Sequence, residues 1–167
     1  MTAEELYERH KDRVFRLCLR FCSGDIGMAE DITQDVFMKM LEQLDTLQAL
    51  DKLEPWFYRV TTNMCFTRLQ RERTMWKKLQ QILVPEVGHV RDTPEHHIQV
   101  KEELQEIDAK LRALPPKERV VFCMVYLDEC SQAQVCEMLS LSKGYVSKLL
   151  QRAQSRLTQK GWDLSHV

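Results

Sequence analysis

Glycine, long apolar runs and paired cysteines are all scarce in this chain of 167 residues. Only five glycines are present, which favours helices throughout the chain. No apolar run approaches the roughly 20 residues that a membrane-spanning helix needs. The N-terminal stretch MTAEELYERH is polar and acidic, unlike a signal peptide. These absences predict a cytoplasmic protein that is not inserted in a membrane.

Six cysteines are present, but their spacing does not point to disulfides. None of them forms a C-x-x-C pair, so we expect reduced thiols. Cys18 and Cys22 lie one helical turn apart and offer two metal ligands, with His10 or His89 as remote partners. Both cysteines fall on an apolar stripe, however, and cysteine is among the most buried residue types. We therefore predict core packing with no metal and no cofactor, and keep a thiol or metal sensor as an alternative.

Charge is distributed unevenly along the chain. The overall net charge of −1 conceals a neutral segment at residues 1–84, an acidic one of −5 at residues 85–108 and a basic one of +4 at residues 109–167. Hydrophobic residues make up 44% of the chain, enough to form real cores. This pattern predicts two modules with different partners, residues 1–84 and 109–167, joined by an acidic linker that includes the start of a connecting helix.

Residues 131–157 have the pattern of a helix-turn-helix. Ser131 and Gln134 form a capping-box pattern, and Ser142 is a plausible cap for a second helix after a four-residue break. Between Lys143 and Lys160 there are five cations and no acid, which suits the major groove of DNA. The alternative is a helical hairpin with a solvated basic face. The candidate DNA-facing residues are Lys143, Tyr145, Ser147, Lys148 and Arg152.

The N-terminal half contains a helical pattern from about residue 26 to residue 47. Its inward positions are Ala29, Ile32, Val36, Met40 and Leu44. A second face, at spacings of three and four, carries Asp31, Gln34, Asp35 and Met38. A patch of this kind on a stiff helix is either a solvated surface or a protein-docking surface, and the spacing does not distinguish the two.

A long helix is predicted from Pro55 to a point before Pro85. Its first turns place Trp56, Phe57, Val60 and Met64 inward, and its later turns carry Arg68, Arg71, Arg73, Lys77 and Lys78. Phe57, Tyr58, Phe66 and Trp76 interleave with these cations, a pattern that suits single-stranded nucleic acid. Thr93-Pro94 starts a further helix, and the apolar run at residues 120–127 is also predicted to be helical.

Four stretches resemble the extracytoplasmic-function group of bacterial RNA polymerase sigma factors. They are AEDITQDVF (residues 29–37), WFYRVTTN (56–63), LPPKERVVF (114–122) and GYVSKLLQRA (144–153). The last is common to many regulators, but together they follow the family's order and spacing over nearly the whole chain. Three departures from the family pattern are present: Thr67 stands where an acid is usual, Gln134-Val135-Cys136 where the family has Glu-Ile-Ala, and Ser140 where the turn usually has glycine.

The resemblance implies an all-α sigma factor of two small helical domains, the C-terminal one a helix-turn-helix. It implies core RNA polymerase and promoter DNA as partners, and leaves room for an anti-sigma factor. The polymerase would bind Asp31, Gln34, Asp35 and Met38, and the melted −10 element would bind Arg59, Asn63, Arg68 and Arg71. The −35 duplex would be read by Lys143, Tyr145, Ser147, Lys148 and Arg152, and the acidic linker would enter the active-site channel of the polymerase.

Two further expectations concern the class of protein. No nucleophile–base pair or phosphate loop is evident, so the chain is not expected to be an enzyme. The main rival function is a conventional helix-turn-helix regulator whose N-terminal helices sense a ligand or dimerise. Such a sensor would not need an Asp31/Gln34/Asp35 face joined to an arginine-rich aromatic helix.

Overall fold

The computed structural model describes residues 1–82 and 109–162. Within these ranges the chain forms helices and no strand, so the predicted all-α class is confirmed. The helices are α1 (Ala3–Phe21), α2 (Ile26–Glu42), α3 (Leu44–Gln48), α4 (Glu54–Ile82), α6 (Pro116–Phe122), η1 (Cys123–Leu127), α7 (Gln132–Leu139) and α8 (Lys143–Gln159). The predicted linker, the helix start at Thr93-Pro94 and the predicted helix end before Pro85 lie outside the described residues.

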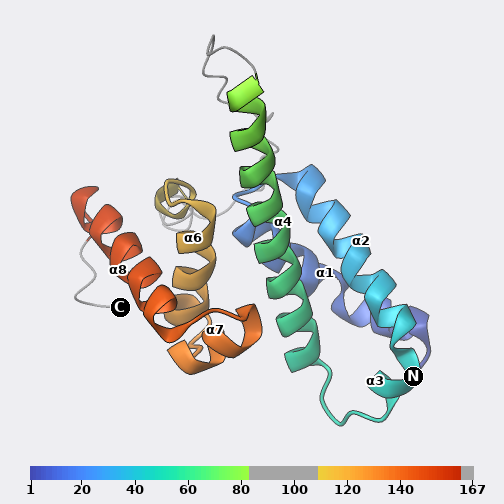
Figure 1. Ribbon diagram of the computed structural model, residues 1–167. Coiled ribbons are helices and arrows are strands. Elements are labelled where there is room, and N and C mark those ends of the chain that lie inside the picture. The colour runs from blue at the N-terminus through green and yellow to red at the C-terminus, as the bar shows by residue number, and fades with distance from the viewer. Residues whose placement is uncertain (83–108, 163–167) are drawn as a thin grey trace.

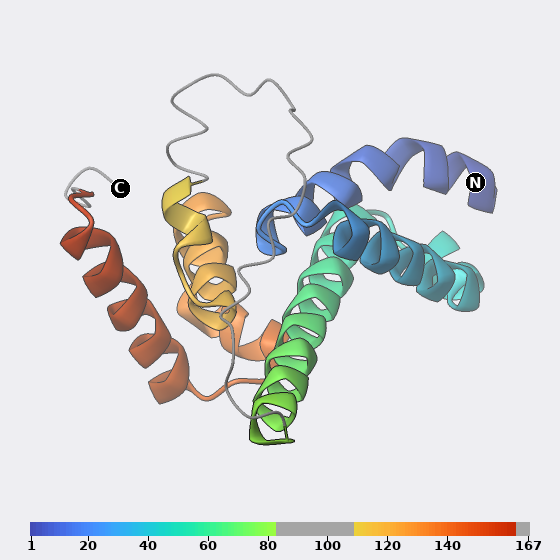
Figure 2. The same ribbon diagram turned by 90° about the horizontal axis from the view of Figure 1, so that it is seen from above.

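The helices form two units that pack against each other (Figure 1). In the N-terminal unit, residues 1–82, helices α1, α2 and α4 pack together. In the C-terminal unit, residues 109–162, α6 packs on α8, and α7 packs on both η1 and α8. Figure 2 shows α8 at one edge of the molecule and α2 towards the other, with α4 beside α6 and α7.

Side-chain caps fix where the helices of the N-terminal unit begin. A capping box forms at α1, where Thr2 Oγ1 accepts from the backbone N–H of Glu5 and the Glu5 carboxylate accepts from that of Thr2. Asp25 caps α2 through the N–H of Met28, at 3.0 Å. The prediction of one helix over residues 26–47 is wrong, because Gln43 (φ −112°) leaves the helical region and separates α2 from α3.

Thiols and aromatic rings lie at the centre of the N-terminal unit. Cys18 and Cys22 are buried, which confirms their prediction as core residues. Hydrogen bonds with these two thiols, together with burial, raise the pKa of Cys65. His10 is also buried and stacks on Phe57 with 4.3 Å between ring centroids, and burial lowers the pKa of its imidazole. Residues 1–82 and 109–162 contain no group of three or more side chains arranged to hold a metal ion.

The apolar run at residues 120–127 is helical, as predicted, although its second half has π-helical geometry. Helix α6 continues into η1, and Val120, Phe122 and Met124 are fully buried. A helix that is apolar on all sides is stable only inside a core. The ring of Phe122 packs on Tyr126 with 4.7 Å between centroids, so this segment is the central element of the C-terminal unit.

The helix-turn-helix forms as predicted, although its second helix, α8, runs to Gln159, two residues beyond the predicted range of 131–157. The hydroxyl of Ser131 accepts from the N–H of Gln134, and the Gln134 side chain accepts from the N–H of Ser131, which closes the predicted capping box. Helix α7 ends at Leu139, and Ser140 adopts the left-handed conformation (φ 54°) that glycine adopts without strain. The Ser142 hydroxyl then caps α8 through the N–H of Tyr145, at 3.2 Å.

Candidate nucleic-acid and protein interfaces

Helix α8 presents a basic surface opposite its buried side. Its buried side is made by Val146, Leu149, Leu150, Ala153 and Leu157, as predicted. Of the candidate DNA-facing residues, Lys143, Lys148 and Arg152 are exposed, whereas Tyr145 and Ser147 are half-buried. Gln151 is also exposed on the outward side, between the positions of Ser147 and Ser155. The candidate residues therefore occupy a single helical surface, to which Gln151 is added.

A residue outside the helix-turn-helix extends this surface. Lys117, in the first turn of α6, donates from Nζ to the Tyr145 hydroxyl at 3.3 Å, and its ammonium lies 5.8 Å from the centre of the Tyr145 ring. Lys117 was not predicted from the sequence, because it lies 28 positions before Tyr145 and only the packing of α6 on α8 brings the two together. A cation held beside the candidate DNA surface is a further potential phosphate contact.

One of the five cations counted on α8 has a structural partner. Arg156 Nε donates to Glu118 Oε2 at 2.9 Å, and the Glu118 side chain is only 5% exposed. A buried carboxylate is costly unless it is paired, so Arg156 stabilises the C-terminal unit as well as adding positive charge.

On α2 the acidic stripe is exposed and flanked by apolar side chains. Asp31, Gln34 and Asp35 all face solvent, and Met38 is 58% exposed. Leu41, which is 50% exposed, continues the stripe one turn further and was not among the residues predicted from the sequence. Its spacing of three from Met38 was the available signal. Methionine is enriched at protein–protein interfaces, so Met38 is the residue of this stripe that favours a docking surface.

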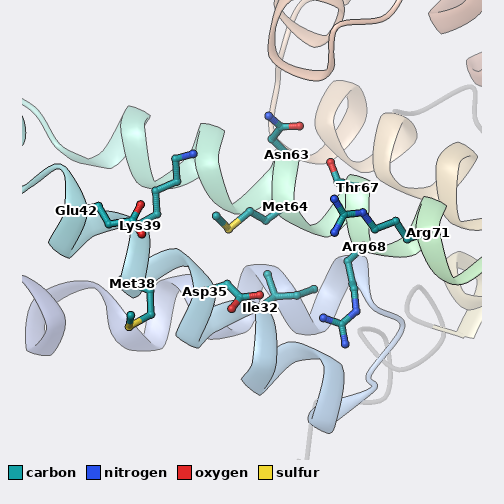
Figure 3. A pocket seen from close by; sticks show the side chains of 10 residues that line it. All are labelled: Ile32, Asp35, Met38, Lys39, Glu42, Asn63, Met64, Thr67, Arg68 and Arg71. Atoms are coloured by element: carbon teal, nitrogen blue, oxygen red, sulfur yellow. The ribbon is translucent and has the colours of Figure 1, made fainter.

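The stripe on α2 adjoins the basic side of α4. A groove of about 450 Å³ lies between the two helices and is lined by Ile32, Asp35, Met38, Lys39, Glu42, Asn63, Met64, Thr67, Arg68 and Arg71 (Figure 3). In this view Arg68 and Met64 lie between the helices, whereas Asn63 points away from α2. Arg68 Nη2 is 3.6 Å from Asp31 Oδ2, so an ion pair links the two candidate sets. Three of the four candidate −10 residues therefore lie on this groove.

The fourth candidate −10 residue, Arg59, does not line this groove and shares its side of α4 with Asn63, four positions later. It lies nine positions before Arg68, which corresponds to opposite sides of a helix with 3.6 residues per turn. Arg59 Nη1 is 3.6 Å from Glu137 Oε1 on α7, and both side chains are more than half exposed. The structure thus divides the four residues between two sides of α4.

The predicted aromatic stacking surface on α4 is wrong for Phe66, which is buried at 5% exposure because it faces the core rather than solvent. Phe57 is also buried, at 3% exposure, which confirms its predicted inward position and leaves its ring unable to stack on a base. Tyr58 is half-buried and donates its hydroxyl hydrogen to Asp128 Oδ2 at 2.7 Å. The backbone of Trp76 belongs to α4, and its side chain lies outside the described structure. None of the helices in the described ranges is long and apolar enough to cross a membrane.

Comparison with known proteins gives consistent matches over both units. Residues 6–74 match the Sigma-70 region 2 family and residues 104–157 match the Sigma-70 region 4 family. The chain is 27% identical to the ECF RNA polymerase sigma factor SigW of Bacillus subtilis, covering 96% of this chain and 89% of SigW. It is 32% identical to the RNA polymerase sigma factor SigZ of the same organism, covering 81% and 74% of the two chains.

Two solved structures have the same fold as this chain. One is the sigma factor RpoE of Bartonella quintana in complex with the anti-sigma factor NepR, with a TM-score of 0.59 and 16% identity over 93% of this chain and 94% of RpoE. The other is CnrH in complex with the cytosolic domain of CnrY, with a TM-score of 0.52 and 19% identity over 94% of this chain and 85% of CnrH.

Proposed function

The chain belongs to the extracytoplasmic-function group of bacterial RNA polymerase sigma factors, and on that premise we propose which of its surfaces perform each step of initiation. A sigma factor directs the polymerase to promoters. The polymerase-binding surface is the α2 stripe of Asp31, Gln34, Asp35 and Met38, extended by Leu41. The observation that supports this assignment is the exposure of two large apolar side chains beside two carboxylates on one rigid helix.

The test for the α2 stripe is a charge reversal. The double variant Asp31→Arg with Asp35→Arg should lose binding to core polymerase while its helical circular dichroism and unfolding temperature stay close to those of the wild type. A matched control, Asp12→Arg with Asp45→Arg, makes the same change in net charge at exposed sites on α1 and α3 and should keep core binding. Equal loss in both variants, or undiminished binding of the first, would contradict the assignment.

The melted −10 element is assigned to Arg59, Asn63, Arg68 and Arg71 on α4. These residues offer three guanidinium groups and one amide along a helix whose exposed end also carries Arg73, Lys77 and Lys78. Capturing an unstacked base costs a few kcal/mol, which charge-assisted contacts of this number can offset. The double variant Asn63→Ala with Arg71→Ala should impair open-complex formation on duplex promoter, and a pre-melted −10 bubble should partly rescue it. Normal opening with intact core binding would contradict this assignment.

The −35 duplex is assigned to Lys143, Tyr145, Ser147, Lys148 and Arg152 on α8. Residues near the start of a recognition helix reach base edges, whereas Arg152, further along, meets phosphate. Arg152→Ala should therefore weaken binding to all sequences about equally and lower the salt slope by roughly one. Lys143 and Ser147 substitutions should change which −35 sequence is preferred. A change of preference from Arg152→Ala, with the salt slope unchanged, would mean that α8 meets DNA with a different side.

Run-off transcription with core polymerase and a promoter library tests the function as a whole. The wild-type protein should start transcripts from a subset of promoters that core polymerase alone does not use. A helix-turn-helix regulator with a sensor domain would instead bind duplex DNA without core and direct no initiation. We also propose an anti-sigma protein as a partner and the cytoplasm as the place of action, on the fold shared with the sigma factor RpoE, solved with the anti-sigma factor NepR, and with CnrH, solved with the cytosolic domain of CnrY.

A further inference from the structure

A row of arginines runs along one side of α1, outside the three proposed binding surfaces. Arg9, Arg13, Arg16 and Arg20 follow one another at spacings of four, three and four residues. At about 100° per residue, these positions fall within about 60° of one another around the helix axis, so they form one straight row. The side chains that α1 buries in the core lie on another side of the helix.

Three of these four arginines are free to bind a partner. Arg9, Arg13 and Arg16 are exposed, and no carboxylate of residues 1–82 and 109–162 lies within 4.0 Å of their guanidinium groups. Arg20 differs from them, because it donates a hydrogen bond to Asp128. The α1 arginine row is therefore defined as Arg9, Arg13 and Arg16.

Such a row lowers the stability of the helix that carries it. Like charges three or four positions apart destabilise a helix, whereas an acid at one of these positions would stabilise it. The same helix contains the stabilised arrangement, since the ammonium of Lys11 lies 2.7 Å from the Glu8 carboxylate. Three aligned cations with no acid partner form a surface that a bound polyanion would stabilise.

The composition of the row favours phosphate groups over a protein surface. All three residues are arginines, whose planar guanidinium groups bind a phosphate through two parallel hydrogen bonds. Protein–protein interfaces are instead built around large apolar or aromatic side chains. On α1, which is described over its full length, the exposed large apolar side chain is Tyr7, and its ring packs on Phe37 of α2. Tyr7 is about 160° from Arg9 around the helix axis, so the row has charge but no apolar centre.

The length of the row suits the backbone of one nucleic-acid strand. A rise of about 1.5 Å per residue places Arg16 about 10 Å from Arg9 along the helix axis, with Arg13 between them. One strand of DNA carries a phosphate about every 3.4 Å along the duplex axis, so the row spans about three phosphates. A single strand can straighten to follow the row, whereas a strand held in a duplex winds away from it.

The row borders a groove that leads to the start of α4. This groove, of about 680 Å³, is lined by Arg13 and Arg16 of α1 and by Pro55 and Tyr58 of α4. Arg59, one of the proposed −10 contacts, directly follows Tyr58 in the sequence and is exposed. A strand bound at Arg59 can therefore continue along the groove to the arginines of α1.

Two carboxylates also line this groove and limit where an anion can lie. Asp128 accepts hydrogen bonds from Arg20 and Tyr58, so its charge is already paired. A backbone hydrogen bond lowers the pKa of Glu54, and the nearby charges of His10 and two arginines of the row lower it further. Because both carboxylates are ionised at neutral pH, we expect the strand to lie on the α1 side of the groove.

We propose that the α1 arginine row binds the phosphate backbone of the melted DNA strand next to the part held by Arg59. The strand-binding surface of α4 would thereby continue onto α1. The contact is to phosphate alone, so it holds the strand without reading its sequence. The position of the strand rests on the proposed function of α4, whereas phosphate binding rests on α1 alone.

The test measures how a fluorescent single-stranded DNA of about 20 nucleotides of mixed sequence binds the full chain, by anisotropy over a range of salt concentrations. The row variant is Arg13→Gln with Arg16→Gln, because glutamine forms helices about as well as arginine. The matched control is Lys11→Gln with Lys160→Gln, which also removes two positive charges but lies away from the row. A further variant, Arg13→Lys with Arg16→Lys, keeps the charge and loses the planar fork.

The expected effect follows from the number of phosphates released. Each phosphate contact to a single strand contributes about 0.7 to the salt slope, or about fivefold in affinity at about 0.1 M salt. The row variant should therefore lower the slope by about 1.4 and weaken binding about 25-fold, equally for A-rich and T-rich strands. The lysine variant should keep most of the slope and bind severalfold more weakly than wild type. The control should stay close to wild type.

Several results would overturn the proposal. A control that binds as weakly as the row variant would assign the loss to net charge. A loss that depends on base sequence, or a wild-type chain that does not bind the strand at low salt, would also be incompatible with it. A poly-glutamate peptide probes the other class of partner. If the row variant lost affinity for this peptide but not for DNA, the row would bind an acidic protein and the proposal would be wrong.

The variant Asn63→Ala with Arg71→Ala distinguishes failure of the row from failure of the α4 assignment. If it weakens DNA binding and the row variant does not, the α4 assignment stands and the row has no role. If only the row variant weakens binding, phosphate binding by α1 stands and the placement of the strand on α4 is wrong. If both surfaces bind one strand, the combined variant should lose more affinity than either one. Circular dichroism checks that every variant is folded.

Discussion

In the C-terminal unit one helix, α8, carries nearly the whole candidate DNA surface, whereas in the N-terminal unit the candidate surfaces are shared between α2 and α4. Helix α8 begins at a serine cap and keeps its buried side through a regular apolar spacing, so neighbouring residues in the sequence define the surface. The N-terminal groove joins Asp35 and Met38 to Asn63 and Arg68, and only the packing of α2 on α4 brings them together. The residues of a surface on one helix can be identified from the local sequence. The residues of a surface between two helices are brought together only by the packing of the helices.

The units also bury polar groups in different ways. In the N-terminal unit His10 is buried as a neutral ring against Phe57. In the C-terminal unit Glu118 and Arg119 are buried as charged groups, each with partners. The cost of burying a histidine rises when acid protonates it, so its burial depends on pH. The cost of burying a charged group is offset by its partner, so its burial depends on that partner. The first unit should therefore be sensitive to acid, and the second to loss of single side chains.

Phe122→Ala should have the largest effect on stability. The ring is fully buried between Tyr126 and Trp162, so truncation should lower the free energy of unfolding of the C-terminal unit by about 3–5 kcal/mol. Hydrogen exchange with peptide resolution should show lost protection in residues 109–162 and much smaller changes in residues 1–82. Equal loss in both units would mean that they unfold together.

Arg156→Ala should come next, because it leaves the buried Glu118 carboxylate without its partner. We expect a loss of about 1–3 kcal/mol in the free energy of unfolding, measured by denaturant titration. The matched N-terminal change is Arg68→Ala, which breaks the ion pair between Arg68 (38% exposed) and Asp31 (61% exposed). It should lower the free energy of unfolding by less than about 0.5 kcal/mol. Adding Glu118→Gln to Arg156→Ala should recover part of the loss. Similar costs for the two arginine variants would contradict the comparison.

His10 should make the N-terminal unit sensitive to acid. Burial lowers the pKa of His10 in the folded chain below its ordinary value of about 6.5, so the unfolded chain takes up the proton first as pH falls. The free energy of unfolding should have its full value above about pH 6.5. It should decrease as the pH falls below this value and level off below the folded-state pKa of His10. Chemical denaturation between pH 5 and 7.5 measures this slope, and His10→Gln should flatten it. An unchanged slope in that variant would assign the acid sensitivity to other groups.

The smallest effects come from two serines with the same backbone conformation. Ser23 and Ser140 both have positive φ, at 59° and 54°. At the exposed Ser140, glycine relieves the left-handed strain at some entropic cost, and Ser140→Gly should stabilise the C-terminal unit by about 0.5 kcal/mol. Ser23→Gly gains the same relief but loses the hydrogen bond to Arg119, so its net effect should be zero or destabilising. Thermal unfolding of the two variants compares the signs, and equal signs would contradict the role of the Ser23 hydroxyl.

Much of the fold follows from local sequence patterns. The capping box at Ser131, the turn at Ser140 and the apolar side of α8 were all predicted, because caps and helical spacing involve residues only three or four positions apart. The helical state of residues 120–127 also followed, since a single strand would have had no partner in a helical chain. The break at Gln43 was missed, because no proline or glycine marks it.

The candidate sites were predicted less completely, for a physical reason that differs from residue to residue. Helical spacing placed Phe57 inward, and it lies in the core, whereas Phe66 was expected beside the cations and is also buried. Lys117 was missed because its partner Tyr145 belongs to another helix. Leu41 could have been found from its spacing to Met38, but an isolated apolar residue on a surface carries little signal.

The sequence by itself determined the helices, their caps, the basic side of α8 and the acidic stripe of α2, because these depend on neighbours within about one helical turn. Only the tertiary structure decided that Arg68 pairs with Asp31, that Arg59 turns instead towards Glu137, and that Asp128 binds Arg20 and Tyr58 of the other unit. Such contacts join residues from different helices, and they depend on how buried surfaces fit together. A helix cap is formed by residues only a few positions apart, so the local sequence determines it. A contact between helices stabilises the chain only after both helices have formed and packed together.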